Sequence, residues 1–371
     1  MELYFFKHKT HLLILTLIIV AIVFFQNINL PISDPIIDTD KESVAILRDN
    51  ILISESKLSA QPLLNDVMAK GVIIDCDSEY IIDEKRYFEV QQHFASLANT
   101  NLKDKKLEYV MYAKLPPDKT RLDLLIEYDR DYPNTSLALM EALYICTGSN
   151  DNENCTKQLV ESATASDKEN AATWFNAVLF HAERNNDSDV LNAIDGMLKA
   201  SIFNEKRGER IKLYANALKG SEVNDFSVRV ISGIGVEAAR SLNISSIIRW
   251  CKNGLNETVK SNSCLLLGND LQNRGKELIS QWIGIALQKL IYKSENNTKR
   301  LEELERETEQ SGAIIMSNDF QKASSLMFHD EGLLFHWLDN LDLIGEVESA
   351  NLLIEEATIL SHEKGPNICK A

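Results

Sequence analysis

A succession of short amphipathic segments places the strongest constraint on the fold of this chain. From Pro117 onward, apolar residues recur mostly at i, i+3, i+4 and i+7, which is the spacing of one face of a helix. Connections rich in Asn, Asp, Ser or Gly separate these segments. Two strand-like stretches, at 72–75 and 228–231, are short and have no hairpin turn to pair them. The sequence therefore predicts an all-α fold of antiparallel helical hairpins.

Prolines and polar stretches divide the chain into regions. Pro116 and Pro117 interrupt the helical pattern, and the charged stretch 296–310 reads as an exposed helix or a mobile connection, which makes it the expected internal hinge. We expect five regions: an N-terminal signal anchor (1–30), a linker (31–40), an N-terminal helical region (41–116), a disulfide-stapled helical-repeat region (117–295) and a C-terminal helical region (296–371).

One stretch of the repeat region resembles a known family. Trp174, Ala177, Val178 and His181 precede a polar Asn-Asn-Asp-Ser turn, and a second helix follows around Met197. This arrangement resembles a degenerate tetratricopeptide repeat, over one or two units near residues 134–201, although the proline expected at the repeat end is absent. The resemblance implies hairpins stacked as a tetratricopeptide-like array and a role as a protein-interaction scaffold.

The N-terminus carries an apolar run from Leu12 to Phe25, preceded by Lys7 and Lys9. Lysines ahead of an apolar segment favour a cytoplasmic N-terminus and an exported C-terminal body. The residues after Phe25 are not the small ones that signal cleavage requires. We therefore expect an uncleaved single-pass anchor in the cell inner membrane with a periplasmic body; the alternative is a cleaved signal and a soluble periplasmic protein.

The charge of the chain argues against one class of partner. With a formal net charge of −16, the chain lacks the excess of Lys and Arg with which proteins grip a phosphate backbone. We expect no nucleic-acid partner. The acidic balance fits a solvated surface on an exported protein.

Four of the six cysteines stand at predicted helix ends. Cys146 ends one helix and Cys155 begins the next; Cys251 and Cys264 repeat the arrangement across a polar connector. The ends of a tight helical hairpin approach closely enough for a disulfide, and an exported protein meets oxidising conditions. We predict the bonds Cys146–Cys155 and Cys251–Cys264, each contributing about 2.5–3 kcal/mol by loop entropy.

The other two cysteines lie near the ends of the body. Cys76 precedes the repeat region and Cys369 lies two residues from the C-terminus. They either join the two ends of the body or stay free. Neither belongs to a C-x-x-C motif, so the sequence gives little support for a redox-active role.

Two motifs resemble functional sites but lack the structural context or the spacing that such sites require. Gly233, Gly235 and Ala238 match the G-x-G-x-x-A dinucleotide fingerprint, but helices flank them where a β-α-β unit is required, so we interpret the glycines as helix-packing residues. His329 and His336 flank an acidic pair and can share a helix face, yet their spacing is not that of a compact metal motif. The sequence predicts no catalytic residue, metal site or cofactor.

These observations leave three functional hypotheses. The first is a membrane-anchored, exported helical-repeat scaffold that binds other envelope proteins. The second is a cell-envelope enzyme, acting on cell-wall material, with an unrecognised helical active site, for which the neighbourhood of His329 is the place to look. The third is an assembly role in which the helices hold a partner at the membrane.

Overall fold

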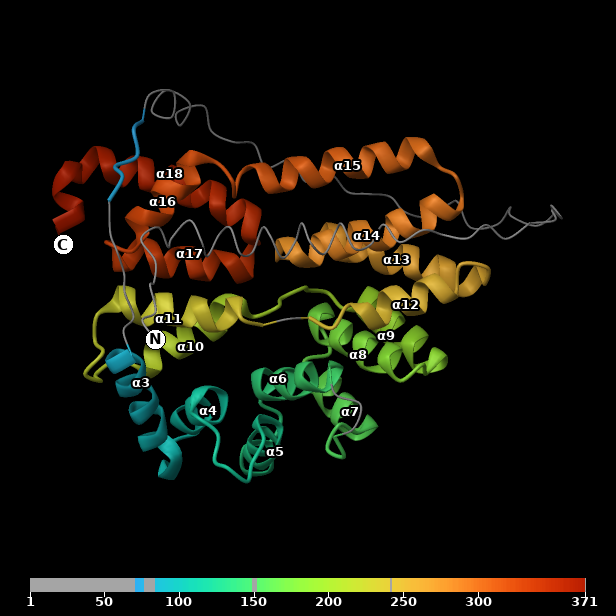
Figure 1. Cartoon of the computed structure of the whole chain (residues 1–371), viewed down its shortest axis with the longest axis horizontal. Coiled ribbons are helices and arrows are strands. Elements are labelled where there is room, and N and C mark those ends of the chain that lie inside the picture. The colour runs from blue at the N-terminus through green and yellow to red at the C-terminus, as the bar shows by residue number, and fades with distance from the viewer. Residues whose placement is uncertain (1–70, 77–83, 149–151, 241, 371) are drawn as a thin grey trace, which may run out of the picture. The chain divides into compact units, whose positions relative to one another are not determined.

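The computed structural model describes residues 71–76, 84–148, 152–240 and 242–370, all within one compact unit (Figure 1). In these residues the chain is helical and forms no β-strand, apart from an isolated bridge between Asn170 and Ile202. The all-α prediction is confirmed. The expected anchor, linker and residues 41–70 lie outside the described residues. No helix in the described ranges is both long and apolar enough to span a bilayer.

The first helices form a consecutively packed series. Each of α4 to α6 packs against the next helix, α6 also contacts α8, and α8 pairs with α9. Their bounds are α3 (Glu84–Ser96), α4 (Lys103–Tyr112), α5 (Arg121–Asp131), α6 (Ser136–Thr147), α7 (Lys157–Ser166), α8 (Ala171–Glu183) and α9 (Asp187–Lys199), with a 3₁₀ turn η1 (Leu97–Asn99).

Side-chain caps explain where several of these helices begin. Thr120 accepts a hydrogen bond from the backbone N–H of Asp123, whose carboxylate accepts one from the Thr120 N–H, which is a complete capping box. Asn170 and Asn186 cap α8 and α9 in the same manner, each through its side-chain oxygen. Local sequence therefore sets these boundaries, close to those expected from the pattern.

The pair α8–α9 is the segment that resembles a tetratricopeptide repeat. The two helices pack side by side, and the Trp174 ring lies directly over Gly196 of α9. A Cβ atom at Gly196 would lie 2.5 Å from a carbon of that ring, so the close approach depends on glycine. The helical-hairpin arrangement is present here.

The helices after α9 return to the first series. α12 packs against α8 and α13 packs against α9, while α13, α14 and α15 pack on one another in order. In an open solenoid each repeat touches only its neighbours, so these contacts close part of the array onto itself. The bounds are α10 (Arg207–Ala217), α11 (Phe226–Ala238), α12 (Ser245–Asn253), α13 (Thr258–Arg274), α14 (Leu278–Ser294) and α15 (Thr298–Ala313).

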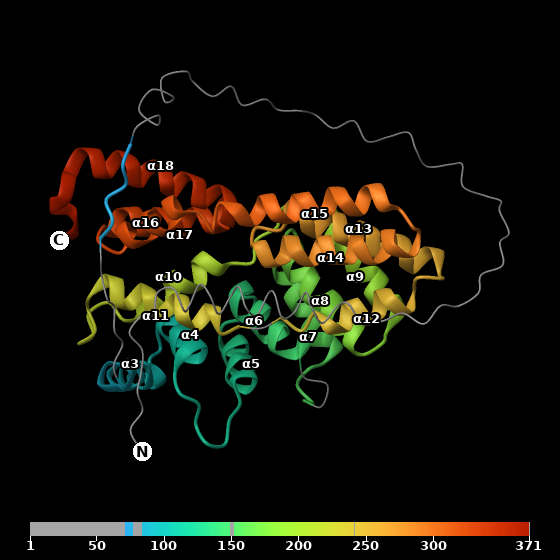
Figure 2. The ribbon, with the colours of Figure 1, turned by 45° about the horizontal axis from the view of Figure 1, so that its top comes forward.

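The last helices form a layer against α10. α17 (Glu331–Leu343) contacts α10, and α16 (Asn318–Met327) and α18 (Glu346–Lys364) complete the layer before a final 3₁₀ turn, η2 (Gly365–Lys370). The extended segment 71–76 runs beside this layer in both views (Figures 1 and 2). Buried apolar residues form two clusters, and α10 contributes to both, through Tyr214 to one and Ile211 to the other.

Three disulfides join the six cysteines. Cys146 pairs with Cys155 and Cys251 with Cys264, at Cα–Cα distances of 5.4 and 5.8 Å, and these are the two pairs expected from the spacing. The third bond joins Cys76 to Cys369 across a sequence separation of 293. It resolves the alternative left open by the sequence, because these two cysteines join the ends of the body. Three disulfides indicate an oxidising compartment outside the cytoplasm.

Candidate functional site

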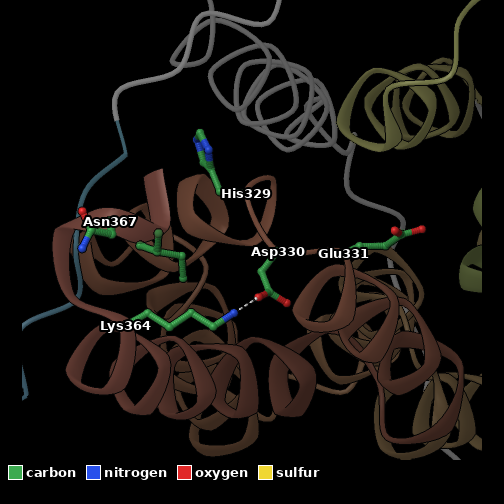
Figure 3. A pocket seen from close by; sticks show the side chains of 6 residues that line it. His329, Asp330, Glu331, Lys364 and Asn367 are labelled. Carbon is green, nitrogen blue, oxygen red and sulfur yellow. Dashed lines mark hydrogen bonds and ion pairs between the residues drawn. The ribbon is translucent and has the colours of Figure 1, made fainter. Parts of the chain in front are cut away.

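A cavity of about 390 Å³ opens where α16, α17 and the C-terminal turn meet (Figure 3). The chain breaks its helix between Met327 and Glu331, and this break places His329 and Asp330 at the cavity. The end of α18 and the turn η2 supply the other wall. The lining residues are His329, Asp330, Glu331, Lys364, Asn367 and Ile368.

Asp330 joins two of these elements. Its carboxylate accepts the backbone N–H of Leu333 at 2.9 Å, which caps α17, and pairs with the Lys364 ammonium at 2.7 Å. Burial raises the pKa of Asp330, but Lys364 and the backbone N–H groups lower it by more, so the pKa lies below its ordinary value. The carboxylate therefore stays ionised and holds the two walls of the cavity together.

His329 presents a different kind of group to the cavity. Burial lowers the pKa of its imidazole, which favours the neutral ring at neutral pH. In Figure 3 the ring points away from the Asp330–Lys364 pair, and the Glu331 side chain also points away from it. Glu331 lies 3.8 Å from the guanidinium of Arg229 on α11. The cavity thus combines a neutral imidazole with a satisfied ion pair.

The second histidine weighed from the sequence lies elsewhere. His336 stands inside α17 and its Nδ1 lies 2.7 Å from Glu356 of α18, away from the residues that line the cavity. The two histidines do not share one helix, because the break at residues 328–330 separates them. Over the described ranges, no group of three or more His, Cys, Asp or Glu side chains could hold a metal ion.

The dinucleotide-like glycines lie in the helix α11. A Cβ atom on Gly233 would lie 3.2 Å from the Ile211 carbonyl oxygen of α10, which fits the interpretation of a packing glycine. Gly235 has no neighbour within 4 Å of such an atom, so that interpretation does not extend to it. The stretch 228–231, whose apolar run is strand-like in sequence, is part of the same helix, as the all-α prediction requires. The backbone here lacks the strand-turn-helix geometry that a pyrophosphate site requires.

The structure also brings together two half-buried carboxyl groups that the sequence did not single out. Glu205 accepts hydrogen bonds from the backbone N–H groups of Lys276 and Glu277, at 3.2 and 3.3 Å, where α14 begins. Burial, and next the Glu277 carboxyl, raise the pKa of Glu205 to about 8. Burial also raises the pKa of Glu277. No local pattern marks these residues, because they lie 72 positions apart in sequence.

Arginines surround this carboxyl pair. Arg207 pairs with Glu346 of α18 at 3.1 Å, and Arg210 pairs with Glu237 of α11 at 2.7 Å. Burial lowers the pKa of Arg210, but its attraction and hydrogen bond to Glu237, together with the nearby carboxylates of Glu141 and Glu277, outweigh burial, and the net shift of the pKa is upward. These ion pairs and hydrogen bonds link α10, α11, α14 and α18. We interpret them as an electrostatic connection between the two clusters of buried apolar residues.

An exposed aromatic pair marks the outer end of the first series. Tyr87 and Phe88 lie near the start of α3 and are 63% and 60% exposed, whereas Val90 and Phe94 further along the same helix are buried. The N-terminal end of α3 therefore presents two large rings to solvent. We call Tyr87 and Phe88 the α3 aromatic patch.

The comparisons with known proteins complete this description. No protein-family model, no curated protein and no solved structure matches the chain.

Proposed function

We propose that the protein is a membrane-anchored, exported helical scaffold that binds other proteins of the cell envelope. The observation that carries this proposal is the α3 aromatic patch, in which two neighbouring rings more than half exposed stand at the N-terminal end of a helix whose later turns bury Val90 and Phe94. Aromatic side chains are enriched in the cores of protein interfaces and among the residues that dominate binding energy.

The charges beside the patch are mixed. The Lys85 ammonium lies 3.4 Å from the Glu89 carboxylate, and Glu84 begins the same helix. This end of α3 therefore favours no single sign of charge on the partner, and the two rings supply the apolar area that is buried on binding.

The architecture and the disulfides support the rest of the proposal. Consecutively packed helices, together with the tetratricopeptide-like pair α8–α9, provide a rigid frame for a binding surface. The disulfides fit a body on the periplasmic side of the inner membrane. The single-pass anchor over residues 1–30, with a cytoplasmic N-terminus, rests on the sequence pattern alone; a cleaved signal would leave the same body free in the periplasm.

The proposal is tested by photo-crosslinking in the native host. A photoreactive amino acid replaces Phe88 in the full-length chain, and crosslinked partners are identified by mass spectrometry. We expect one or two envelope proteins, in reproducible stoichiometry.

The matched control uses an exposed apolar residue outside the patch. Val259 on α13 is 65% exposed. The photoreactive residue at position 259 should not capture the same proteins, and Tyr87→Ala/Phe88→Ala should abolish copurification while Val259→Ala preserves it. Equal capture from both positions, or none from position 88, contradicts the proposed surface.

A second candidate function rests on the cavity at His329. A neutral imidazole beside an ionised carboxylate and an ammonium is a set of groups suited to acid–base chemistry. The proposed alternative is an envelope enzyme acting on cell-wall material. Turnover of purified peptidoglycan fragments by the wild-type chain, lost in His329→Ala, would support it; no turnover at any pH between 5 and 9 would remove it.

A further inference from the structure

The extended segment 71–76, which we call the strap, is held by few contacts. Ile73 is 6% exposed and joins the apolar cluster of α16–α18. The backbone N–H of Ile74 donates to the Ser361 hydroxyl of α18 at 3.0 Å, and the Ser325 hydroxyl of α16 donates to the Cys76 carbonyl oxygen. The strap itself forms no helix or strand. The buried residues of the strap, Ile73 and Cys76, thus depend on the C-terminal layer for their position, whereas Val72 is 77% exposed.

The Cys76–Cys369 disulfide supplies the covalent part of this attachment. Cys76 is 1% exposed, whereas Cys369 lies in the final turn η2 and is partly exposed, so Cys369 is the more accessible end of the bond. Cys155 is likewise partly exposed and bonded to a buried Cys146, whereas Cys251 and Cys264, which join α12 to α13, are both 0% exposed. Access to an attacking thiolate is one factor that sets which disulfide is reduced first, and it separates Cys251–Cys264 from the other two bonds.

Loop length separates the disulfides in a second way. Breaking Cys251–Cys264 leaves its two helices connected by a separation of 13 residues, so the cysteines stay close. Breaking Cys76–Cys369 leaves its cysteines joined by a separation of 293 residues, so only the noncovalent contacts of the strap and of η2 still bring them together. Closing a long loop costs more entropy than closing a short one. The long-range disulfide is therefore the bond whose loss most readily lets its two cysteines separate.

We propose that Cys76–Cys369 is a redox-controlled latch, which a protein dithiol opens to release the strap from the C-terminal layer while the remaining helices stay folded. One thiolate of the dithiol attacks the Cys369 sulfur, the S–S bond breaks, and Cys76 leaves as a thiolate that takes up a proton. The second thiol of the reductant then attacks the mixed disulfide and releases Cys369. Two electrons and two protons pass to the protein, and the dithiol becomes a disulfide.

The latch also connects to the cavity described above. Asn367 and Ile368, which line it, directly precede Cys369 in η2. Once the disulfide opens, this turn loses its covalent link to the strap, and its position depends on contacts such as that of Ile368, which is 3% exposed in the same apolar cluster as Ile73. The latch thus acts on a turn that lines the His329 cavity, independently of the proposed scaffold function.

The test uses the purified full-length chain and graded dithiothreitol as the dithiol. Alkylation of free thiols, read by mass spectrometry, reports which cysteines are reduced, and hydrogen exchange reports local opening. We expect Cys76 and Cys369 to be alkylated before Cys251 and Cys264. At that stage, exchange in residues 71–76 and 365–370 should rise at least tenfold, while peptides of α8 and α9 remain unchanged.

Two outcomes would overturn the latch. In one, Cys251 and Cys264 are reduced first; in the other, Cys76 and Cys369 are reduced but exchange in the strap does not change. Loss of protection throughout the chain at the same stage also overturns it, because the bond would then hold the whole fold.

Variants repeat the test without a reductant. Cys76→Ser/Cys369→Ser should show rapid exchange in the strap, whereas the matched Cys146→Ser/Cys155→Ser should leave the strap protected. If the Cys76→Ser/Cys369→Ser chain fails to fold, this argues against a local latch. Graded reduction of the wild-type chain, which folds with the disulfide intact, then tests the latch independently.

Discussion

Replacing Glu205 by Gln should remove most of the alkaline loss of stability that this residue imposes. The Glu205 carboxyl lies at the start of α14, accepts backbone N–H groups from Lys276 and Glu277, and has a pKa raised to about 8 by burial and by the Glu277 carboxyl. Gln keeps an acceptor oxygen for these N–H groups but cannot ionise. The substitution therefore removes the free-energy cost of ionising this carboxyl in the folded chain while it keeps an acceptor for the two hydrogen bonds.

The sign of the effect follows from proton binding. The folded pKa of about 8 exceeds the ordinary value of 4.5, so between these values the folded chain holds a proton that the unfolded chain releases. The stability that Glu205 contributes is complete below pH 4.5 and is lost as the pH rises through 8. At 1.36 kcal/mol per pKa unit, this shift sets an upper limit of roughly 5 kcal/mol. The shared titration with Glu277 and partial solvent contact reduce the expectation to about 2–4 kcal/mol.

The assay is denaturant unfolding at pH 5, 7 and 9, followed by circular dichroism. We expect Glu205→Gln and the wild type to have similar free energies of unfolding at pH 5, and the variant to be more stable at pH 9 by about 2–4 kcal/mol. Glu302→Gln, at an exposed position of α15, should follow the wild type throughout. Parallel profiles for Glu205→Gln and the wild type from pH 5 to 9 would refute the reasoning.

Three further predictions address the disulfides, the ion network and the cavity. Cys251→Ser/Cys264→Ser opens a loop with a separation of 13 residues and should lower the free energy of unfolding by about 3 kcal/mol in guanidinium chloride; no change would contradict the loop-entropy account. Glu237→Gln leaves the Arg210 guanidinium buried without its charged partner and should cost about 3–5 kcal/mol in thermal unfolding, whereas a loss below about 1 kcal/mol would show that the pair is dispensable. The His329 imidazole should titrate below the ordinary value of 6.5 in an NMR pH series, because burial disfavours its charged form, and a midpoint above that value would contradict this account.

Local features of the structure could be predicted from the sequence. Helix type and approximate bounds follow from apolar spacing and from caps such as Thr120 and Asn170, which act over a few residues. The two disulfides expected from spacing also join near neighbours in sequence, with separations of 9 and 13. In each case the determinant and its effect lie within one helix or one hairpin, so the sequence suffices.

The candidate site followed from sequence only in part. His329 was the place to look for a cavity, but the helix break that puts it there and sends His336 toward Glu356 was not anticipated. The partners in the cavity, Lys364 and Asn367, come from a different element more than thirty residues away. A sequence pattern can identify a reactive side chain, but the side chains that surround it in space depend on how the helices pack.

The sequence by itself determined an all-α chain with local disulfides and an apolar N-terminal segment, because these depend on periodicity, caps and short separations. Only the tertiary structure decided that Cys76 meets Cys369 and that Glu205 meets Glu277. The first contact depends on the strap lying along α16 and α18, and the second on the connection before α10 lying against the start of α14. Such contacts are set by the mutual fit of whole helix faces, and the free energy of that fit is spread over many residues rather than written in any one segment.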